Sequence, residues 1–520
     1  MNTSATTETG ADRGPNTGQP LFPPDIDPVT GRPRPPDGCM PDIGQATDLD
    51  ASLRFAAANH DVLRYCPGVG WLHWSGSYWE TDGDSAHAIE LSKQCARRWT
   101  DAALNAFRRE PIEHNRNQLR TALALESASH LRAAVDLARS DPRIAISSAE
   151  LDREPWKLCV LNGTLDLRTG LIGTHLREDF ITKQAPVKFL PGATHEALTR
   201  CLTNMERTSP GMPDFMARCF GAALSGDTSC EALFLLQGEG GSGKTTITEG
   251  FATMLGDYAV KLPFNSFCLT KHGRSPGSAS PDLVRLRGCR FAYASEGDQT
   301  AKLDAGVVKS LTGGEPFTAR DLYKASITFE QTWKLWLVSN YDPRVDSEDS
   351  GMWRRIVKIP FATVPPEARD PNLKLILTTD PSARSALLAW AASGCLEWQK
   401  NGRGRAGLGI PGEVASTTEE YRLKQDTLAD WWTDLLREYE ICNCGFLSGA
   451  LLRLNYKDWA EAEGIVHLVS TQRLNSYLEG KGLMKSRRSG LRGWEGIRVK
   501  PVPSLKTQQP LRANNALWKS

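Results

Sequence analysis

The stretch LFLLQGEGGSGKTTITEGFATML, residues 233–255, decides the fold class. It opens with a short apolar run typical of a buried strand, continues through a glycine-rich loop and ends in a helix-forming segment. The loop from Gly238 to Thr245 fits the pattern G-x-x-x-x-G-K-[ST] at each fixed position. Glycines let backbone N–H groups turn inward onto phosphate oxygens, and the helix N-terminus favours an anion. The stretch therefore predicts a phosphate-binding loop in an α/β unit.

Two side chains of this loop have expected chemical roles. Lys244 is expected to reach the β- and γ-phosphates of a nucleotide, and Thr245 is expected to ligate Mg²⁺. The loop alone indicates nucleotide binding and does not separate kinases, GTPases, motors and helicases. The residues expected to bind the cofactor ATP are Gly238, Glu239, Gly240, Gly241, Ser242, Gly243, Lys244, Thr245 and Thr246.

Two polar residues follow apolar strands downstream of the loop. Glu296 comes directly after the apolar stretch 291–295 and is the candidate second Mg²⁺ ligand, with Asp298 as the alternative. Asn340 ends the strand predicted at 333–339, where an amide can orient the attacking water or contact the γ-phosphate. The competing interpretations are a surface acid for Glu296 and a turn former for Asn340.

A pair of arginines, Arg354 and Arg355, precedes the short apolar strand that begins at Ile356. A guanidinium placed on the γ-phosphate of a neighbouring subunit would act as an arginine finger, which is worth roughly 10³–10⁵ in rate. The alternative is a solvated basic pair. The sequence does not decide which of the two is the finger.

The order of these motifs resembles a known family. A phosphate loop, a strand-end Glu, KSLTGGEPFTAR at 309–320, a strand-end Asn and RRIVKIPF at 354–361 follow one another. This resembles the superfamily 3 helicase domain of phage and plasmid primase-helicases, which are related to the poxvirus primase-helicase. VLNGTLDLRTG at 160–170 looks like the family's domain before the helicase, and the likeness covers about residues 53–500. Ser242 and Glu315 are mild departures, since the family usually has Asn and Asp there.

The resemblance implies a fold and a mechanism. The fold would be an α/β P-loop NTPase core, AAA+-like, with an α/β N-terminal domain and a C-terminal winged-helix-like domain. The activity would be DNA unwinding that depends on ATP and Mg²⁺. The resemblance implies that identical subunits form a ring, a hexamer, which translocates 3′ to 5′ on single-stranded DNA. Residues 318–329 fall where the family places a β-hairpin facing the channel, with Lys324 as the expected DNA contact and Arg320 as the second choice.

The expected domain order has six parts. Residues 1–52 are predicted to be a disordered Pro/Gly-rich leader, because they carry few large apolar side chains. The remaining parts are the family-specific domain at 53–228, the ATPase domain at 229–400, a linker at 401–414, a winged-helix-like domain at 415–503 and a tail at 504–520.

The C-terminal part has a basic stretch. Residues 471–478 are a plausible recognition helix, and residues 481–500 hold seven Lys/Arg against one Glu, as in a β-wing. The functional interpretation is DNA binding, and the competing one is a protein-docking module. The candidate DNA contacts in this part are Arg473, Arg487 and Arg488.

Composition sets outer limits on these predictions. With 62 basic and 61 acidic residues, any basic surface has to be local. The scattered cysteines argue against structural zinc. No apolar stretch is long enough to span a membrane, so we expect a cytoplasmic protein. Primase activity is not expected, because the D-x-D at 82–84 sits in a predicted turn with no further catalytic pattern nearby, and residues 1–52 are too short and too polar for a folded primase domain. A separate primase or replication initiator is an expected partner. The rival functions are a P-loop DNA motor and an ATP-switched DNA-binding initiator without intrinsic unwinding.

Overall fold

The computed structural model describes most of the chain, namely residues 47–269, 281–295, 302–320, 326–345, 349–425, 427–463 and 468–500. At its centre is a parallel five-stranded sheet with the strand order β13–β7–β12–β9–β8. This confirms the α/β class predicted from the sequence. The strands are β7 (Leu233–Gln237), β8 (Ala259–Lys261), β9 (Phe291–Ser295), β12 (Lys334–Ser339) and β13 (Ile356–Pro360).

Other parts of the chain pack against both faces of this sheet, which explains why its strands are continuous apolar runs in the sequence. Along β7, Phe234 and Leu236 face one apolar core, while Leu233 and Leu235 face another. The first core lies under α6 (Met212–Leu224), α7 (Lys244–Leu255) and α12 (Pro381–Lys400). The second includes side chains from α9 (Ala305–Thr312) and α10 (Ser350–Trp353).

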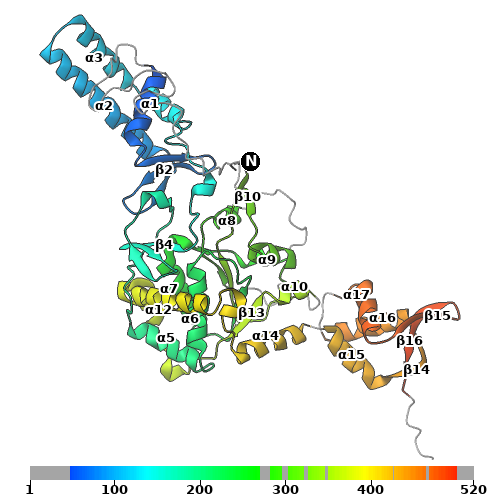
Figure 1. The fold of residues 1–520 in the computed structure, drawn as a ribbon. Coiled ribbons are helices and arrows are strands. Elements are labelled where there is room, and N and C mark those ends of the chain that lie inside the picture. Colours follow the sequence, from blue (N-terminus) through cyan, green and yellow to red (C-terminus); the bar gives the residue numbers. More distant parts are fainter. Residues whose placement is uncertain are drawn as a thin grey trace, which may run out of the picture.

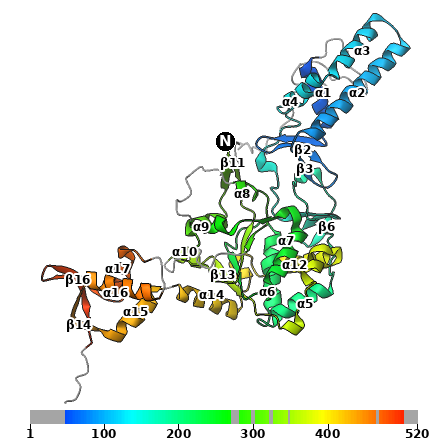
Figure 2. The same cartoon turned by 180° about the vertical axis from the view of Figure 1, so that it is seen from behind.

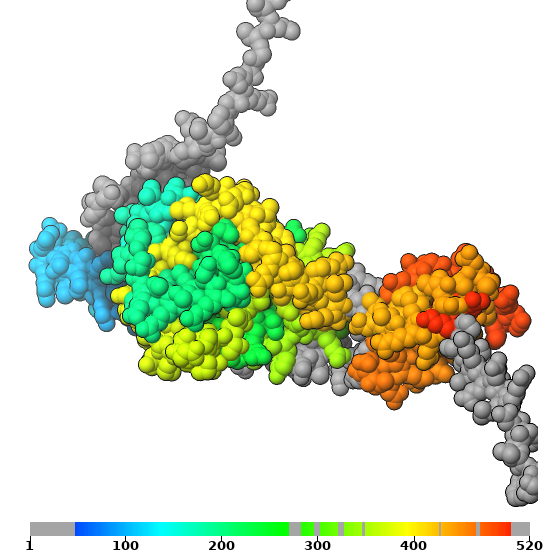
Figure 3. Space-filling view, turned by 90° about the horizontal axis from the view of Figure 1, so that it is seen from below, coloured from blue at the N-terminus to red at the C-terminus, as the bar shows by residue number. Residues whose placement is uncertain are grey.

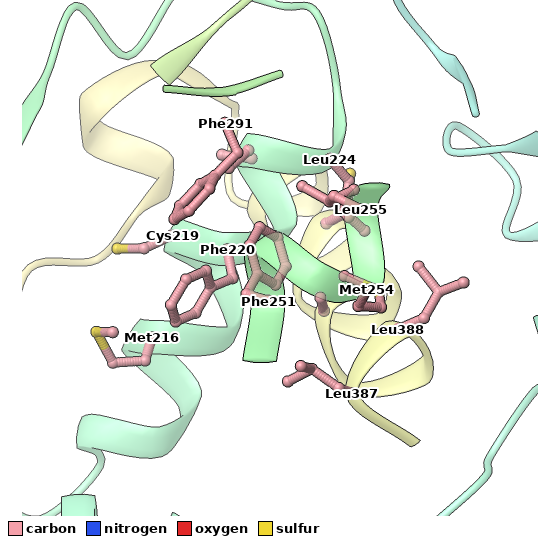
Figure 4. Close-up of a cluster of buried hydrophobic side chains, with 14 of the residues drawn as sticks. Met216, Cys219, Phe220, Leu224, Phe251, Met254, Leu255, Phe291, Leu387 and Leu388 are labelled. Carbon is pink, nitrogen blue, oxygen red and sulfur yellow. The ribbon is translucent and has the colours of Figure 1, made fainter. Parts of the chain in front are cut away.

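Aromatic rings fill the core beneath α6. The Phe220 ring lies 4.4 Å from that of Phe251, which in turn lies 5.0 Å from that of Phe291, measured between centroids (Figure 4). Helices α6 and α12 approach each other closely at two glycines. A Cβ atom on Gly221 would lie 2.2 Å from the backbone nitrogen of Cys395, and one on Gly394 would lie 2.1 Å from the Ala217 carbonyl oxygen. Only glycine fits at these two positions.

The predicted boundary at residue 228 does not separate two cores. Side chains from β4 (Lys157–Val160), β5 (Gly163–Asp166), α5 (Glu196–Glu206) and α6 belong to the same cluster as the sheet. Strands β4 and β5 form an antiparallel pair, and β6 (Leu171–Gly173) extends it. Residues from Trp156 onward therefore pack as part of the ATPase core. Short 3-10 turns lie at Ser148–Glu150, Arg177–Asp179, Gly256–Tyr258, Phe264–Phe267 and Pro366–Ala368.

The first described residues form a helical unit with small cores of its own. Helices α2 and α3 project away from the central sheet (Figure 1), and β2 and β3 form an antiparallel pair. The disorder predicted for residues 1–52 is wrong at the end of that range, because α1 starts at Asp48 and Ala51 is buried. Residues 1–46 lie outside the described part. The elements are α1 (Asp48–Asn59), β1 (Leu63–Cys66), β2 (Gly70–Trp74), β3 (Trp79–Asp82), α2 (Ala86–Arg109), α3 (Glu113–Leu125) and α4 (Ala128–Ala138).

The linker predicted at 401–414 and the domain start at 415 are wrong. Leu408 and Val414 are fully buried in the core beneath α6, and Tyr421 is buried in the core on the other face. Apolar side chains spaced among glycines and arginines thus fix this segment to the ATPase unit, and α14 packs beside β13 (Figure 2). The helices concerned are α11 (Leu373–Thr379), α13 (Gly404–Gly407) and α14 (Gly412–Lys424).

The C-terminal unit, residues 427–500, forms a separate lobe (Figure 3) with its own apolar core around Trp431, Leu452 and Ile497. Its order is helix, strand, helix, helix, strand, strand, and its antiparallel sheet has the order β14–β16–β15. Within the described ranges, no helix is both long enough and apolar enough to cross a bilayer. The elements are α15 (Thr427–Glu438), β14 (Tyr439–Ser448), α16 (Gly449–Ala462), α17 (Thr471–Gly480), β15 (Met484–Arg488) and β16 (Leu491–Val499).

Candidate nucleotide site

The phosphate loop joins the carboxyl end of β7 to the start of α7. Gly243 precedes the helix with a φ of 85°, a left-handed conformation that favours glycine. A Cβ atom on Gly238 would lie 2.2 Å from the Phe361 carbonyl oxygen, so a side chain does not fit there either. The two fixed glycines of the motif are therefore explained by backbone geometry.

The side chain of Lys244 is buried at the centre of this loop. Burial lowers the pKa of its ammonium group from the ordinary value for lysine. Oxygen acceptors surround the group and offset part of the desolvation cost. Its Nζ atom donates to the carbonyl oxygens of Gly238 (2.6 Å) and Glu239 (3.0 Å), to Ser242 Oγ (3.0 Å) and to Asn340 Oδ1 (3.2 Å).

Asn340 meets Lys244 because β12 and β7 are parallel neighbours whose carboxyl ends share one edge of the sheet. Gln237, the last residue of β7, donates its Nε2 to the Asn340 carbonyl oxygen at 3.3 Å. The asparagine side chain is exposed next to the loop. The structure thus places the predicted strand-end amide within hydrogen-bond reach of the predicted phosphate-binding lysine.

The remaining loop residues are open to solvent or bonded within the loop. The hydroxyl-bearing Thr245 is exposed at the start of α7, and Thr246 is half-buried. Ser242 Oγ donates to the Glu239 carbonyl oxygen at 2.9 Å, while the Glu239 carboxylate accepts from Thr363 Oγ1 at 3.3 Å. The predicted Mg²⁺ ligand Glu296 lies outside the described residues, and so does its alternative, Asp298.

The two candidate finger arginines differ sharply in exposure. The Arg355 side chain is 8% exposed; its Nη1 donates to the Gly351 carbonyl oxygen at 2.9 Å and its Nη2 lies 3.3 Å from the Glu231 carboxylate. The Arg354 side chain is 66% exposed and lies 3.5 Å from the same carboxylate. Arg355 therefore has a structural role in this fold, while Arg354 is available to a partner.

Neither arginine lies near the phosphate loop of its own chain. Both precede β13, whose first residue, Ile356, pairs with Leu233 at the start of β7. The loop follows the other end of β7, so the length of a five-residue strand, about 16 Å, separates the two places. Any contact of Arg354 with a nucleotide has to come from a second copy of the chain.

The predicted channel hairpin is present as the antiparallel pair β10 (Phe317–Arg320) and β11 (Ser326–Phe329). Arg320 is exposed at the end of β10. Lys324, the first choice for a DNA contact, lies outside the described residues. At the base of the hairpin the rings of Phe317 and Phe329 pack against Trp333, which ties it to the ATPase core.

The remaining candidate residues lie on the C-terminal lobe and in the D-x-D segment at 82–84, which are both separate from the phosphate loop. Arg487 and Arg488 are exposed on β15, and Arg473 is half-buried on α17. In the D-x-D segment, the buried Asp82 accepts from the Ala88 backbone N–H at 3.0 Å and so has a capping role at the start of α2. Among the described residues there is no cluster of three or more potential metal ligands.

Comparison with known proteins assigns the region before the sheet. Residues 52–211 match the family model described as "D5 N terminal like". This region of the chain is therefore similar to the N-terminal domain of D5 proteins. Residues 236–355, after this D5-like domain, match a family of unknown function, DUF5906. The two matches confirm the resemblance to primase-helicases at the level of domains.

Several viral proteins are similar to this chain. "Putative helicase L207/L206" of Acanthamoeba polyphaga mimivirus is 27% identical over 343 residues, covering 63% of this chain and 35% of its own length. "Putative helicase 022R" of Frog virus 3 is 29% identical, covering 44% and 24%. "Putative primase C962R" of an African swine fever virus isolate is 26% identical, covering 55% and 31%. The matches thus span about a third or less of these relatives.

These relatives bear on one earlier expectation. One is described as a primase, so the expectation that the present chain lacks primase activity gains no support from them.

Among solved structures, the apo form of the NrS-1 C-terminal region covers 71% of this chain and 90% of its own, with 12% identity and a TM-score of 0.39.

The contrast between the two arginines makes a stability prediction. We expect Arg355→Ala to lower the free energy of unfolding by about 2 kcal/mol, because it removes a side chain that is only 8% exposed together with its hydrogen bond to the Gly351 carbonyl oxygen. Arg354→Ala should change it by less than about 1 kcal/mol, because its ion pair is exposed to solvent. Urea unfolding of both variants measures the difference. Equal losses would contradict the division of roles between them.

Proposed function

We propose that this protein is an ATP-dependent DNA helicase of superfamily 3 that acts in replication of a phage, plasmid or related mobile element. The observation that carries the proposal is the contact between Lys244 Nζ and Asn340 Oδ1, at 3.2 Å, on the phosphate loop. A lysine that binds phosphate and an amide that orients water are what nucleotide hydrolysis needs at this place. The D5-like domain and the similarity to viral helicases support the helicase class.

The proposed core is AAA+-like, and ATP is its proposed cofactor with Mg²⁺. The exposed hydroxyl of Thr245 beside the phosphate loop fits a Mg²⁺ ligand, and Glu296 is the proposed acidic partner. Bound Mg²⁺ would neutralise charge that develops on the transferred phosphate. Lys244 would exchange its bonds to the loop carbonyls for phosphate oxygens, and Asn340 would hold the attacking water.

The proposed assembly is a ring of identical subunits, with six as the number that the family implies. Head-to-tail contacts in such a ring bring one subunit's Arg354 to the next subunit's phosphate loop. This arrangement agrees with the exposure of Arg354 and with its distance from its own loop. A DNA-binding switch that does not hydrolyse ATP has no use for an arginine in this position.

The β10–β11 hairpin is the proposed contact with single-stranded DNA in the channel. Arg320 and Lys324 would grip backbone phosphates without reading sequence. The C-terminal lobe has the order of elements found in winged helices, with α17 in the place of a recognition helix and β15–β16 as the wing. Its proposed contacts with duplex DNA are Arg473, Arg487 and Arg488. A separate primase or initiator is the proposed protein partner.

Strand displacement on a forked DNA substrate with ATP and Mg²⁺ tests the helicase proposal. We expect unwinding by the native protein and at least about 100-fold slower ATP hydrolysis in Lys244→Ala, which loses the phosphate contact. Lys324→Ala should hydrolyse ATP but unwind poorly. Arg422→Ala, on the exposed face of α14, is the matched control. ATP hydrolysis without opening of forks of either polarity would favour the rival motor function.

The winged-helix proposal has its own test in the salt dependence of duplex binding. The double variant Arg487→Ala with Arg488→Ala should bind duplex DNA more weakly and reduce the slope of log K against log salt by about 2, one for each lost phosphate contact. Arg437→Ala, an exposed arginine elsewhere on the same lobe, serves as the control. An unchanged slope in the double variant would favour a protein-docking module.

A further inference from the structure

The segment that follows β13 runs along the phosphate loop and is bonded to it. The Phe361 N–H donates to the Gln237 carbonyl oxygen at 2.8 Å, where β7 ends. Further on, the Val364 N–H donates to the Gly241 carbonyl oxygen at 3.4 Å. Residues 361–369 therefore hold a fixed position beside the loop, on the side opposite to Asn340, because β13 and β12 flank β7.

This segment brings one arginine onto the loop. Arg369 Nε donates to the Val364 carbonyl oxygen at 2.8 Å, which orients its guanidinium. A Cβ atom on Gly241 would lie 3.0 Å from Arg369 Cζ and 3.1 Å from its Nη2. The guanidinium thus lies beside Gly241, in the loop whose backbone N–H groups are expected to bind phosphate.

Arg369 has no anionic partner in the described part of the chain. Its side chain is exposed, and the carboxylate that follows it, Asp370, is paired with Arg200 at 2.8 Å. A planar guanidinium can bind a phosphate group through two parallel hydrogen bonds. Lys244 is the cation already assigned to this loop, and Arg369 supplies a second positive charge from the other side.

We propose that Arg369 binds the phosphate chain of the nucleotide, in the same subunit as Lys244. The proposal rests on the proposed function of the loop as an ATP site. Two cations of one chain, Lys244 and Arg369, would then bind the phosphates from two sides of the loop. The Arg354 of a neighbouring subunit would be a third. The competing role is a purely structural clamp that holds residues 361–369 against the loop.

Competition binding separates these roles. A fluorescent ATP analogue bound to the full-length protein is displaced by ATP or by inorganic tripolyphosphate, which carries no base or sugar. We expect Arg369→Ala to weaken both competitors about 10- to 100-fold, the effect of losing hydrogen bonds to a charged group. Arg369→Lys, which keeps the charge and loses the fork, should be intermediate. Arg422→Ala is the control, and thermal unfolding should match the native protein in all three variants.

Other outcomes overturn the proposal in distinguishable ways. If ATP binding weakens while tripolyphosphate binding does not, Arg369 contacts the base or sugar. If binding weakens only together with a clear fall in unfolding temperature, Arg369 is a clamp. If Lys244→Ala weakens both competitors and Arg369→Ala weakens neither, the assignment of Arg369 alone fails. If neither variant weakens either competitor, the nucleotide site itself is wrong.

Discussion

The ammonium of Lys244 is the group on which the arrangement of the site depends. It is buried where the two central strands of the sheet end, and its acceptors come from the loop backbone and from Asn340 on the neighbouring strand. A buried cation has to be satisfied by such acceptors. This requirement fixes the loop against β12 and aligns the lysine with the amide. The parallel register of β7 and β12, set by apolar side chains on both faces, keeps these two residues together.

The same sheet places the phosphate loop and the proposed finger arginine at opposite edges of one chain. The phosphate loop and Asn340 lie at the carboxyl edge, while Arg354 and Arg355 lie at the amino edge of β13. Burial then distinguishes the two arginines, since the Arg355 side chain is largely buried and the Arg354 side chain is left at the surface. Strand polarity and burial thus support the proposal that a second subunit completes the site.

The sequence predicted the local secondary structure around the candidate site well, because each element depends on a few neighbouring residues. The phosphate loop, the hairpin at β10–β11 and the central α/β sheet follow from glycine spacing and apolar runs. The division into domains was less successful, because Leu408 and Tyr421 are buried by residues distant in sequence. Arg369 was missed for the same reason: no local pattern shows that the segment after β13 returns to the loop. The chemical roles of all the candidate site residues stay predictions, and Glu296 and Lys324 also lie outside the described residues.

Mixing two inactive variants tests the central claim, that the nucleotide site is completed by a second subunit. Lys244→Ala lacks the phosphate contact but keeps Arg354, and Arg354→Ala has the reverse defect. Each alone should hydrolyse ATP very slowly. In an equal mixture, about a quarter of head-to-tail interfaces would combine an intact loop with an intact arginine, so ATP hydrolysis should recover to about a quarter of the native rate. No recovery in assemblies shown to contain both variants, or native activity of Arg354→Ala alone, would contradict the account.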